Sequence, residues 1–282
     1  MPVAVVDIGT NTTRLLVAEV EDGQVVELER RTLITALGQG VDSSGRLAQE
    51  AMDRVAEAIA VYREVIDRLG TERVVALATS AMRDAENGLE FRDYLKERFG
   101  IEPRTISGDE EARLTFLGAT SNRNDEQEYV VIDIGGGSTE YVVGRPGADP
   151  EFHVSTQMGS VRFTERFEDL DEMAAAVREL VPDVSVEQGI AVAGTATSLA
   201  AIDGAEQVHG YRLSLASCER MVAMLAGMTL EERRQVKGLH PDRAPTIVAG
   251  AVILTESIRA LDLREVEVSV ADILHGAALS AS

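Results

Sequence analysis

The same stretch of sequence occurs twice in this chain, and that repeat limits the possible folds more than any other feature. The run VVDIGTNTTRLLV from Val5 to Val17 returns as VIDIGGGSTEYVV from Val131 to Val143, an offset of 126 residues. This offset equals the length of one small domain, whereas solenoid repeats return every ~20–50 residues. The chain is therefore predicted to contain two similar domains.

Each copy of the repeat is typical of a β-hairpin that continues into a third strand. A β-rich run leads into a turn of Gly, Thr, Asn and Ser, and a second β-rich run follows at Leu15–Val20 and at Tyr141–Val143. Extended runs at Val25–Arg31 and Glu151–Val154 complete a three-stranded meander in each copy. A dinucleotide fingerprint or a P-loop would need a helix directly after the glycines, so the pattern disfavours both.

After each meander the pattern changes to helices that alternate with strands. Apolar residues recur every three to four positions over Glu50–Leu69, which predicts a helix with one buried face. Another helix is expected to begin after a capping box at Ser107–Glu110. We expect further strands at Val74–Ala78, Arg104–Ile106, Ile190–Ala193 and Val266–Val270, and further helices at Glu86–Phe99, Ser160–Phe167, Asp171–Leu180, Ser214–Met228, Thr229–Val236 and Thr246–Ala260, after the Gly194-Thr195 turn, and after Asp272.

These elements give an α/β fold with two predicted domains, residues 1–123 and 124–282. The polar stretch Ser121–Glu128 contains few apolar residues to bury and is the expected linker. The last helix, residues 272–282, is expected to pack back across the hinge.

The charge balance argues against two classes of partner. The 282 residues include 27 Lys and Arg against 48 Asp and Glu, a formal net charge of −21. Binding to nucleic acid or to an anionic membrane needs basic surface, so we expect neither. Apolar stretches such as Ile247–Leu254 are far shorter than the roughly 18–20 residues of a membrane span, and the N-terminus lacks the basic segment of a signal peptide. With Cys218 as the only cysteine, a cytoplasmic protein is expected.

The two hairpin turns are suited to hold phosphate. Glycine lets the backbone approach an anion closely, and successive N–H groups in a turn can donate several hydrogen bonds to it. The hydroxyls of Thr10, Thr12, Ser138 and Thr139 and the amide of Asn11 add neutral donors.

An aspartate precedes each turn, Asp7 in the first copy and Asp133 in the second. A carboxylate beside a phosphate repels it unless a divalent cation lies between them, so the two aspartates suggest Mg²⁺, or Mn²⁺ in its place. The four histidines share no metal-ligand spacing, and a zinc site is not expected.

A third candidate is Gly194-Thr195, where a predicted strand ends before a helix. Helix N-termini attract anions, which favours another phosphate or ribose contact. The alternative is a helix capped by Thr195 or Thr197 with no ligand.

Three motifs follow one another along the chain: DIGTN at 7–11, SGDEEARL at 107–114 and VIDIGGGSTE at 131–140. In this order and at these separations they resemble the exopolyphosphatase/guanosine pentaphosphate phosphohydrolase (Ppx/GppA) family, in its short two-domain form. The resemblance covers essentially the whole chain. It implies the sugar kinase/Hsp70/actin superfold, in which two ribonuclease-H-like domains enclose an active site in an interdomain cleft.

By this resemblance Glu111 corresponds to the catalytic base, whereas the neighbouring Glu110 is expected to be occupied by the capping box. Arg83 corresponds to the family's arginine after the strand Val74–Ala78, suited to grip phosphate. Glu140 corresponds to an acidic position that assists metal binding beside Asp7 and Asp133. With the two turns and the third element, the predicted phosphate-binding residues are Gly9, Thr10, Asn11, Thr12, Gly135, Gly136, Gly137, Ser138, Thr139, Gly194 and Thr195.

The resemblance implies a Mg²⁺-dependent hydrolase that removes the terminal phosphate of inorganic polyphosphate with a Glu-activated water. Guanosine pentaphosphate is the alternative substrate, and a polyphosphate or alarmone sensor without turnover is the alternative to an enzyme. An ATP-dependent small-molecule kinase of the same superfold would not explain the motif at 107–114. Larger members carry a C-terminal extension that this chain lacks, so we expect a preference for short polyphosphates. The family often forms dimers, and a homodimer is expected.

Overall fold

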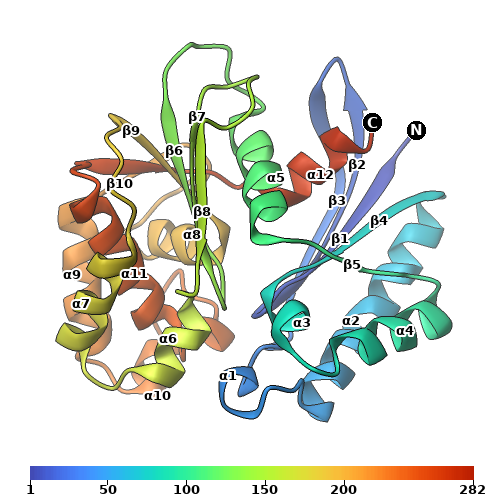
Figure 1. Cartoon of the computed structure of the whole chain (residues 1–282), viewed down its shortest axis with the longest axis horizontal. Coiled ribbons are helices and arrows are strands. Elements are labelled where there is room, and N and C mark those ends of the chain that lie inside the picture. The colour runs from blue at the N-terminus through green and yellow to red at the C-terminus, as the bar shows by residue number, and fades with distance from the viewer. The chain divides into compact units, whose positions relative to one another are not determined.

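Each copy of the repeat lies at the centre of its own β-sheet. The structure, a computed structural model, describes residues 1–282 and divides into two compact units. Unit 1 comprises Met1–Asn122 together with Ile273–Ser282, and unit 2 comprises Arg123–Asp272. The predicted α/β fold class is confirmed, with one sheet in each unit (Figure 1).

The sheet of unit 1 has five strands in the order β3-β2-β1-β4-β5. Its strands are β1 (Val3–Ile8), β2 (Thr12–Glu21), β3 (Gln24–Ile34), β4 (Arg73–Ala78) and β5 (Arg104–Thr105). The first three form an antiparallel meander, whereas β1, β4 and β5 run parallel. All six residues of β1 are buried, as expected for a strand whose sheet is covered on both faces.

Helices cover both faces of this sheet. Alternate residues of β1 join two separate apolar clusters, because successive side chains of a strand point to opposite faces. One cluster includes side chains of α2 (Gln49–Arg68) and α4 (Gly88–Phe99). The other includes the C-terminal helix α12 (Ile273–Ser280), which packs against α5 (Gly108–Thr120). The last helix is thus part of unit 1, although the chain reaches it only after unit 2.

The sheet of unit 2 has six strands in the order β10-β11-β9-β6-β7-β8. Its strands are β6 (Tyr129–Ile134), β7 (Thr139–Gly144), β8 (Phe152–Thr156), β9 (Gln188–Val192), β10 (Tyr211–Ser214) and β11 (Glu265–Val268). The strands β6, β7 and β8 repeat the antiparallel meander of unit 1, while β6, β9 and β11 run parallel.

The core of unit 2 forms around one apolar helix. The helices are α6 (Ser160–Arg166), α7 (Leu170–Leu180), α8 (Ala193–Ile202), α9 (Leu215–Ala226), α10 (Leu230–Arg233) and α11 (Ile247–Ala260). Twelve consecutive residues of α11, from Ile247 to Ile258, are buried, and this helix contacts α6, α7, α8 and α9. No helix in either unit is both long enough and apolar enough to cross a membrane.

The parallel strands of each sheet end at one edge. In unit 1, Ile8 lies opposite Ala78, and Ala78 lies opposite Thr105. In unit 2, Asp133 lies opposite Val192. Because the segments that follow these strands leave from the same edge, loops far apart in the sequence meet there.

Most predicted elements are present, and the differences concern short pieces. The strand β10 and the short helices α1 (Val41–Ser44) and α3 (Ser80–Asp84) were not predicted. A helix of four or five residues is too short to show a helical period, and only one of the four residues of β10 is buried. The helix expected after Gly194-Thr195 instead begins at Ala193, so both residues lie in its first turn.

Candidate active site

The turn that joins β1 to β2 in unit 1 is fixed through its carbonyl groups. The N–H of Gly9 donates to Thr12 O at 2.9 Å and closes the turn. The carbonyl of Thr10 accepts from Gly38 N at 2.8 Å, and that of Asn11 accepts from Thr35 N at 3.0 Å. The N–H groups of Thr10 and Asn11 donate to no acceptor in the chain. This turn therefore offers two adjacent donors to a ligand.

The turn that joins β6 to β7 in unit 2 repeats this arrangement. The N–H of Gly135 donates to Ser138 O at 3.0 Å, which matches the bond of the first copy. The carbonyls of Gly135 and Gly136 accept from the first N–H groups of α6, and Gly137 O accepts from Arg162 Nε at 2.7 Å. The N–H groups of Gly136 and Gly137 donate to no acceptor in the chain. Successive backbone N–H groups of this kind suit a phosphate.

Close packing, rather than backbone strain, explains the need for glycine here. None of the glycines of the two turns has a positive φ. A Cβ at Gly9 would lie 3.0 Å from Thr12 O, and one at Gly135 would lie 3.1 Å from Ser138 O. A Cβ at Gly159, just before α6, would lie only 2.3 Å from Gly136 O. Gly159 therefore lets the start of α6 reach the carbonyls of the turn.

Some hydroxyl groups of the two turns already form hydrogen bonds within their own unit. Thr10 Oγ1 lies 2.8 Å from Ser80 Oγ, which ties the first turn to α3. Thr139 Oγ1 donates to Met158 O within unit 2. Ser138 is buried, and its hydroxyl makes no hydrogen bond in the chain. Of these three hydroxyls, only that of Ser138 is not already used within its unit.

The carboxylate before each turn faces a different partner in the two units. In unit 1, Asp7 lies directly across the strand pair from Arg14, whose Nε and Nη2 donate to Asp7 Oδ2 at 2.9 and 2.6 Å. In unit 2, the equivalent position places Glu140 across from Asp133. Both carboxylates of this second pair are buried, and Ser155 Oγ donates to Glu140 Oε1 at 2.6 Å.

The residues of unit 2 fit a hard divalent cation better than those of unit 1. Directly opposed like charges on a sheet are unfavourable, and a divalent cation between two carboxylates offsets their repulsion. Mg²⁺ in proteins is commonly held by one or two carboxylates and completed by water and substrate phosphates, and the pair Asp133 and Glu140 is compatible with that pattern. No group of three or more His, Cys, Asp or Glu side chains is arranged around one metal position. Asp7 already has the Arg14 guanidinium as its counter-charge.

The structure brings Arg83 and Glu111 together in unit 1. Arg83 Nη1 lies 3.6 Å from Glu111 Oε2, and it also donates to Ile106 O at 2.9 Å. Arg83 belongs to α3, directly after β4, and Glu111 lies in the first turn of α5, after β5. The Glu111 side chain is 12% exposed, and the Arg83 guanidinium is an ion-pair partner of its carboxylate.

Only one of the two hydrogen bonds of the predicted capping box at Ser107–Glu110 is present, so the prediction is wrong for the other. Ser107 Oγ accepts from Glu110 N at 3.2 Å, as expected for an N-cap. The carboxylate of Glu110, however, binds the guanidinium of Arg104 through two hydrogen bonds of 2.6 and 2.5 Å. The Arg104 hydrogen bond lowers the pKa of Glu110 below its usual value. Glu110 is occupied as predicted, but by an arginine of the preceding strand. At the start of α10, by contrast, Thr229 and Glu232 form a complete capping box.

The third predicted element lies at the start of α8. Neither Thr195 nor Thr197 caps this helix, because the N-cap position is Val192. Thr195 packs against α11, where a Cβ at Gly250 would lie 2.6 Å from its hydroxyl. Gly194 lies under the guanidinium of Arg243, whose Nη1 is 1.9 Å from the position of a Gly194 Cβ. The first turn of α8 thus has a guanidinium beside it.

The structure places two arginines beside the second turn and the start of α8, and neither of them was predicted from the sequence. Arg162 binds the second turn through Gly137 O, and Arg243 covers Gly194. The only local signal for Arg162 was its place at the start of a predicted helix. Arg243 is the last residue of a short 3₁₀ segment, Pro241–Arg243, which has no periodic pattern.

The comparisons of this chain with known proteins lead to the same family. The Ppx/GppA phosphatase family matches residues 16–281. The chain is 36% identical to Exopolyphosphatase 2 of Mycobacterium tuberculosis, over 99% of this chain and 98% of that protein. Among solved structures, an exopolyphosphatase-like protein is 34% identical, with a TM-score of 0.92 over 99% of this chain and 97% of its own. The Ppx/GppA enzyme of Aquifex aeolicus is 29% identical, with a TM-score of 0.84 over 99% of each chain.

We predict that Gly159→Ala weakens binding of inorganic phosphate by about tenfold, equivalent to about 1.4 kcal/mol. The added methyl group overlaps Gly136 O and displaces the second turn from the start of α6. Calorimetric titration with phosphate measures the effect, and thermal unfolding shows whether the fold is retained. Gly227→Ala is the matched control, because a Cβ there lies no closer than 3.5 Å to any atom. Equal phosphate affinity in both variants would show that the packing of this turn does not set binding.

Proposed function

Because the chain belongs to the Ppx/GppA phosphatase family, we propose that it is an exopolyphosphatase, which releases the terminal phosphate of inorganic polyphosphate. The likeness in fold and the two sheets agree with the sugar kinase/Hsp70/actin fold expected from the sequence. The observation that carries the proposal is the second turn, where unbonded N–H groups adjoin two opposed carboxylates. The names of the relatives, Exopolyphosphatase 2 and Exopolyphosphatase 1, favour polyphosphate over guanosine pentaphosphate as the substrate.

In the proposed reaction, Glu111 accepts a proton from the attacking water. The water oxygen forms a bond to the terminal phosphorus, the bridging P–O bond breaks, and the shortened polyphosphate leaves with the electron pair. A positioned carboxylate base contributes about 10²–10⁴-fold to such a step. Arg83, 3.6 Å from Glu111, supplies the positive charge that offsets the charge of the transferring phosphoryl group.

The proposed substrate contacts in unit 2 are neutral. The N–H groups of Gly136 and Gly137 and the hydroxyl of Ser138 would donate to phosphate oxygens. Arg162 and the N-terminus of α6 hold the carbonyls of the turn, and this fixes the direction of the N–H groups. Donors that are set before the substrate arrives stabilise a phosphoryl transition state without reorganisation.

We propose that Asp133 and Glu140 hold the divalent cation, Mg²⁺ or Mn²⁺. The cation would neutralise phosphate oxygens and orient the terminal phosphoryl group. The two carboxylates would repel a phosphate in its absence, since both are buried next to the turn. Asp7, with its own arginine, serves in this proposal to fix β1 against β2.

We further propose that short polyphosphates are the preferred substrates. A polyphosphate carries about one negative charge per unit, and a protein of net charge −21 repels a long chain unless a continuous basic track offsets that repulsion. Many arginines of this chain are instead paired with carboxylates of their own unit. Such arginines are Arg14, Arg30, Arg63, Arg104, Arg123, Arg145, Arg178, Arg212, Arg234 and Arg259.

We predict that Glu111→Gln lowers kcat for phosphate release by about two orders of magnitude or more, while KM changes little. The amide keeps the shape of the side chain but cannot accept the proton. Phosphate release from tripolyphosphate and from guanosine pentaphosphate, measured side by side, also tests the choice of substrate.

The neighbouring Glu110→Gln is the matched control for this experiment. It makes the same chemical change one residue away, at a carboxylate that is bound to Arg104. Near-normal kcat in Glu111→Gln would contradict the proposed base. Turnover of guanosine pentaphosphate alone would contradict the proposed substrate, and turnover of neither compound would favour a binding protein.

We predict that kcat/KM per chain end is highest for short polyphosphates and does not rise with length. Lower salt strengthens the repulsion, so activity on long chains falls more steeply than activity on short chains as the salt concentration decreases. Phosphate release from size-fractionated polyphosphates at two salt concentrations measures both effects. Processive digestion of polymers hundreds of units long, without intermediates, would contradict this prediction.

A further inference from the structure

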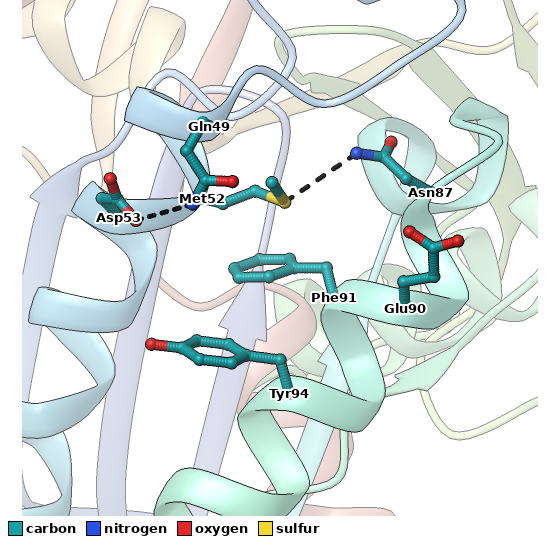
Figure 2. A pocket seen from close by; sticks show the side chains of 7 residues that line it. All are labelled: Gln49, Met52, Asp53, Asn87, Glu90, Phe91 and Tyr94. Atoms are coloured by element: carbon teal, nitrogen blue, oxygen red, sulfur yellow. Dashed lines mark hydrogen bonds between the residues drawn. The ribbon is translucent and has the colours of Figure 1, made fainter.

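A pocket in unit 1 lies outside the residues discussed so far. It has a volume of about 240 Å³ and lies between α2 and α4. Figure 2 shows the seven side chains that line it. They are Gln49, Met52, Asp53, Asn87, Glu90, Phe91 and Tyr94. None of them is among the residues proposed to bind or hydrolyse polyphosphate.

The inner surface of this pocket is apolar and aromatic. The Phe91 ring, 3% exposed, extends from α4 towards Met52 on α2 (Figure 2). The Tyr94 ring stacks beside it with a centroid separation of 6.1 Å and an interplanar angle of 16°. Methylene groups pack well on such a surface, and ring faces attract cations.

The polar groups of the pocket are acidic or neutral. Asp53 on α2 and Glu90 on α4 lie on opposite sides of the Phe91 ring (Figure 2). Asp53 Oδ1 accepts from Gln49 Nε2 at 2.9 Å, while Glu90 forms no hydrogen bond or ion pair in the chain. No lysine or arginine lines the pocket. An anionic ligand is therefore disfavoured, and a cation with an apolar body fits.

Asn87 makes the shape of the pocket independent of a ligand. Its Oδ1 accepts from Leu47 N at 2.8 Å, and its Nδ2 donates to Leu47 O at 3.1 Å. These two bonds join the start of α4 to the segment just before α2. The backbone that carries the pocket's side chains is thus fixed at this point without a ligand.

We propose that this pocket binds an aliphatic diamine. The ammonium groups would bind the carboxylates of Asp53 and Glu90, and the methylene chain between them would lie on Met52, Phe91 and Tyr94. A chain with a positive charge at each end matches an apolar surface flanked by two negative charges. A single metal ion would leave that apolar surface unused, and a neutral ligand would leave the negative charges of both carboxylates unneutralised.

Calorimetric titration with 1,4-diaminobutane tests this site. We expect saturable binding with one site per chain, and no binding of 1,4-butanediol, which has the same length but no charge. Glu90→Gln should raise the Kd at least fivefold, because it removes one of the two charge-assisted contacts. Both Glu90 and the control position are exposed, so neither substitution threatens the fold.

Glu97→Gln on the same helix is the matched control, since it removes an identical charge from an exposed position outside the pocket. Its Kd should stay within twofold of the wild-type value. No binding to the wild-type protein, a rise of less than fivefold in Glu90→Gln, or an equal rise in both variants would overturn the proposal. An equal rise would show that the amine binds the acidic surface as a whole.

Discussion

The parallel alignment of the central strands is the constraint on which both candidate regions depend. β1, β4 and β5 end side by side in unit 1, and so do β6 and β9 in unit 2. This alignment brings Arg83 and Glu111 to one edge although 28 positions separate them in the sequence. It also places the second turn beside the start of α8. If the register shifted by one residue, the side chains of the shifted strand would move to the other face of the sheet, and the segments that follow the strand would be displaced with it.

The two copies of the repeat share the same backbone turn but differ in the charge of the residue opposite the aspartate. In both copies the turn is closed by the same hydrogen bond, from Gly9 to Thr12 and from Gly135 to Ser138. The residue across from the aspartate is Arg14 in one copy and Glu140 in the other. The Asp7–Arg14 ion pair links β1 to β2, whereas the Asp133–Glu140 pair places two like charges across β6 and β7. One hairpin carries an ion pair across its strands, and the other carries the two carboxylates that we propose as metal ligands.

Local pattern was enough to predict the meanders, the long helix α2 and both turns, because each rests on neighbours in the sequence. It could not predict contacts that depend on how separate elements pack. Arg104 binds the carboxylate of Glu110 across the β5–α5 connection, so that carboxylate does not complete the capping box. Arg162 donates to the carbonyl of Gly137, 25 positions earlier in the sequence. The opposition of Asp133 and Glu140 follows from the strand register, which the sequence suggested but did not define. The strand β10 was not predicted, because only one of its four residues is buried and it runs directly into the helix expected from Ser214.

Mn²⁺ binding, followed by the loss of the free-ion signal in electron paramagnetic resonance, tests most directly whether Asp133 and Glu140 form a cation site. Sulfate in the buffer would supply the oxygens that a phosphate provides in the proposed complex. We expect one Mn²⁺ per chain in the wild-type protein, at least tenfold weaker binding in Glu140→Gln, and unchanged binding in Arg14→Gln, which alters the equivalent position of the other copy. Unchanged binding in Glu140→Gln, or no Mn²⁺ bound to the wild-type protein, would contradict the account.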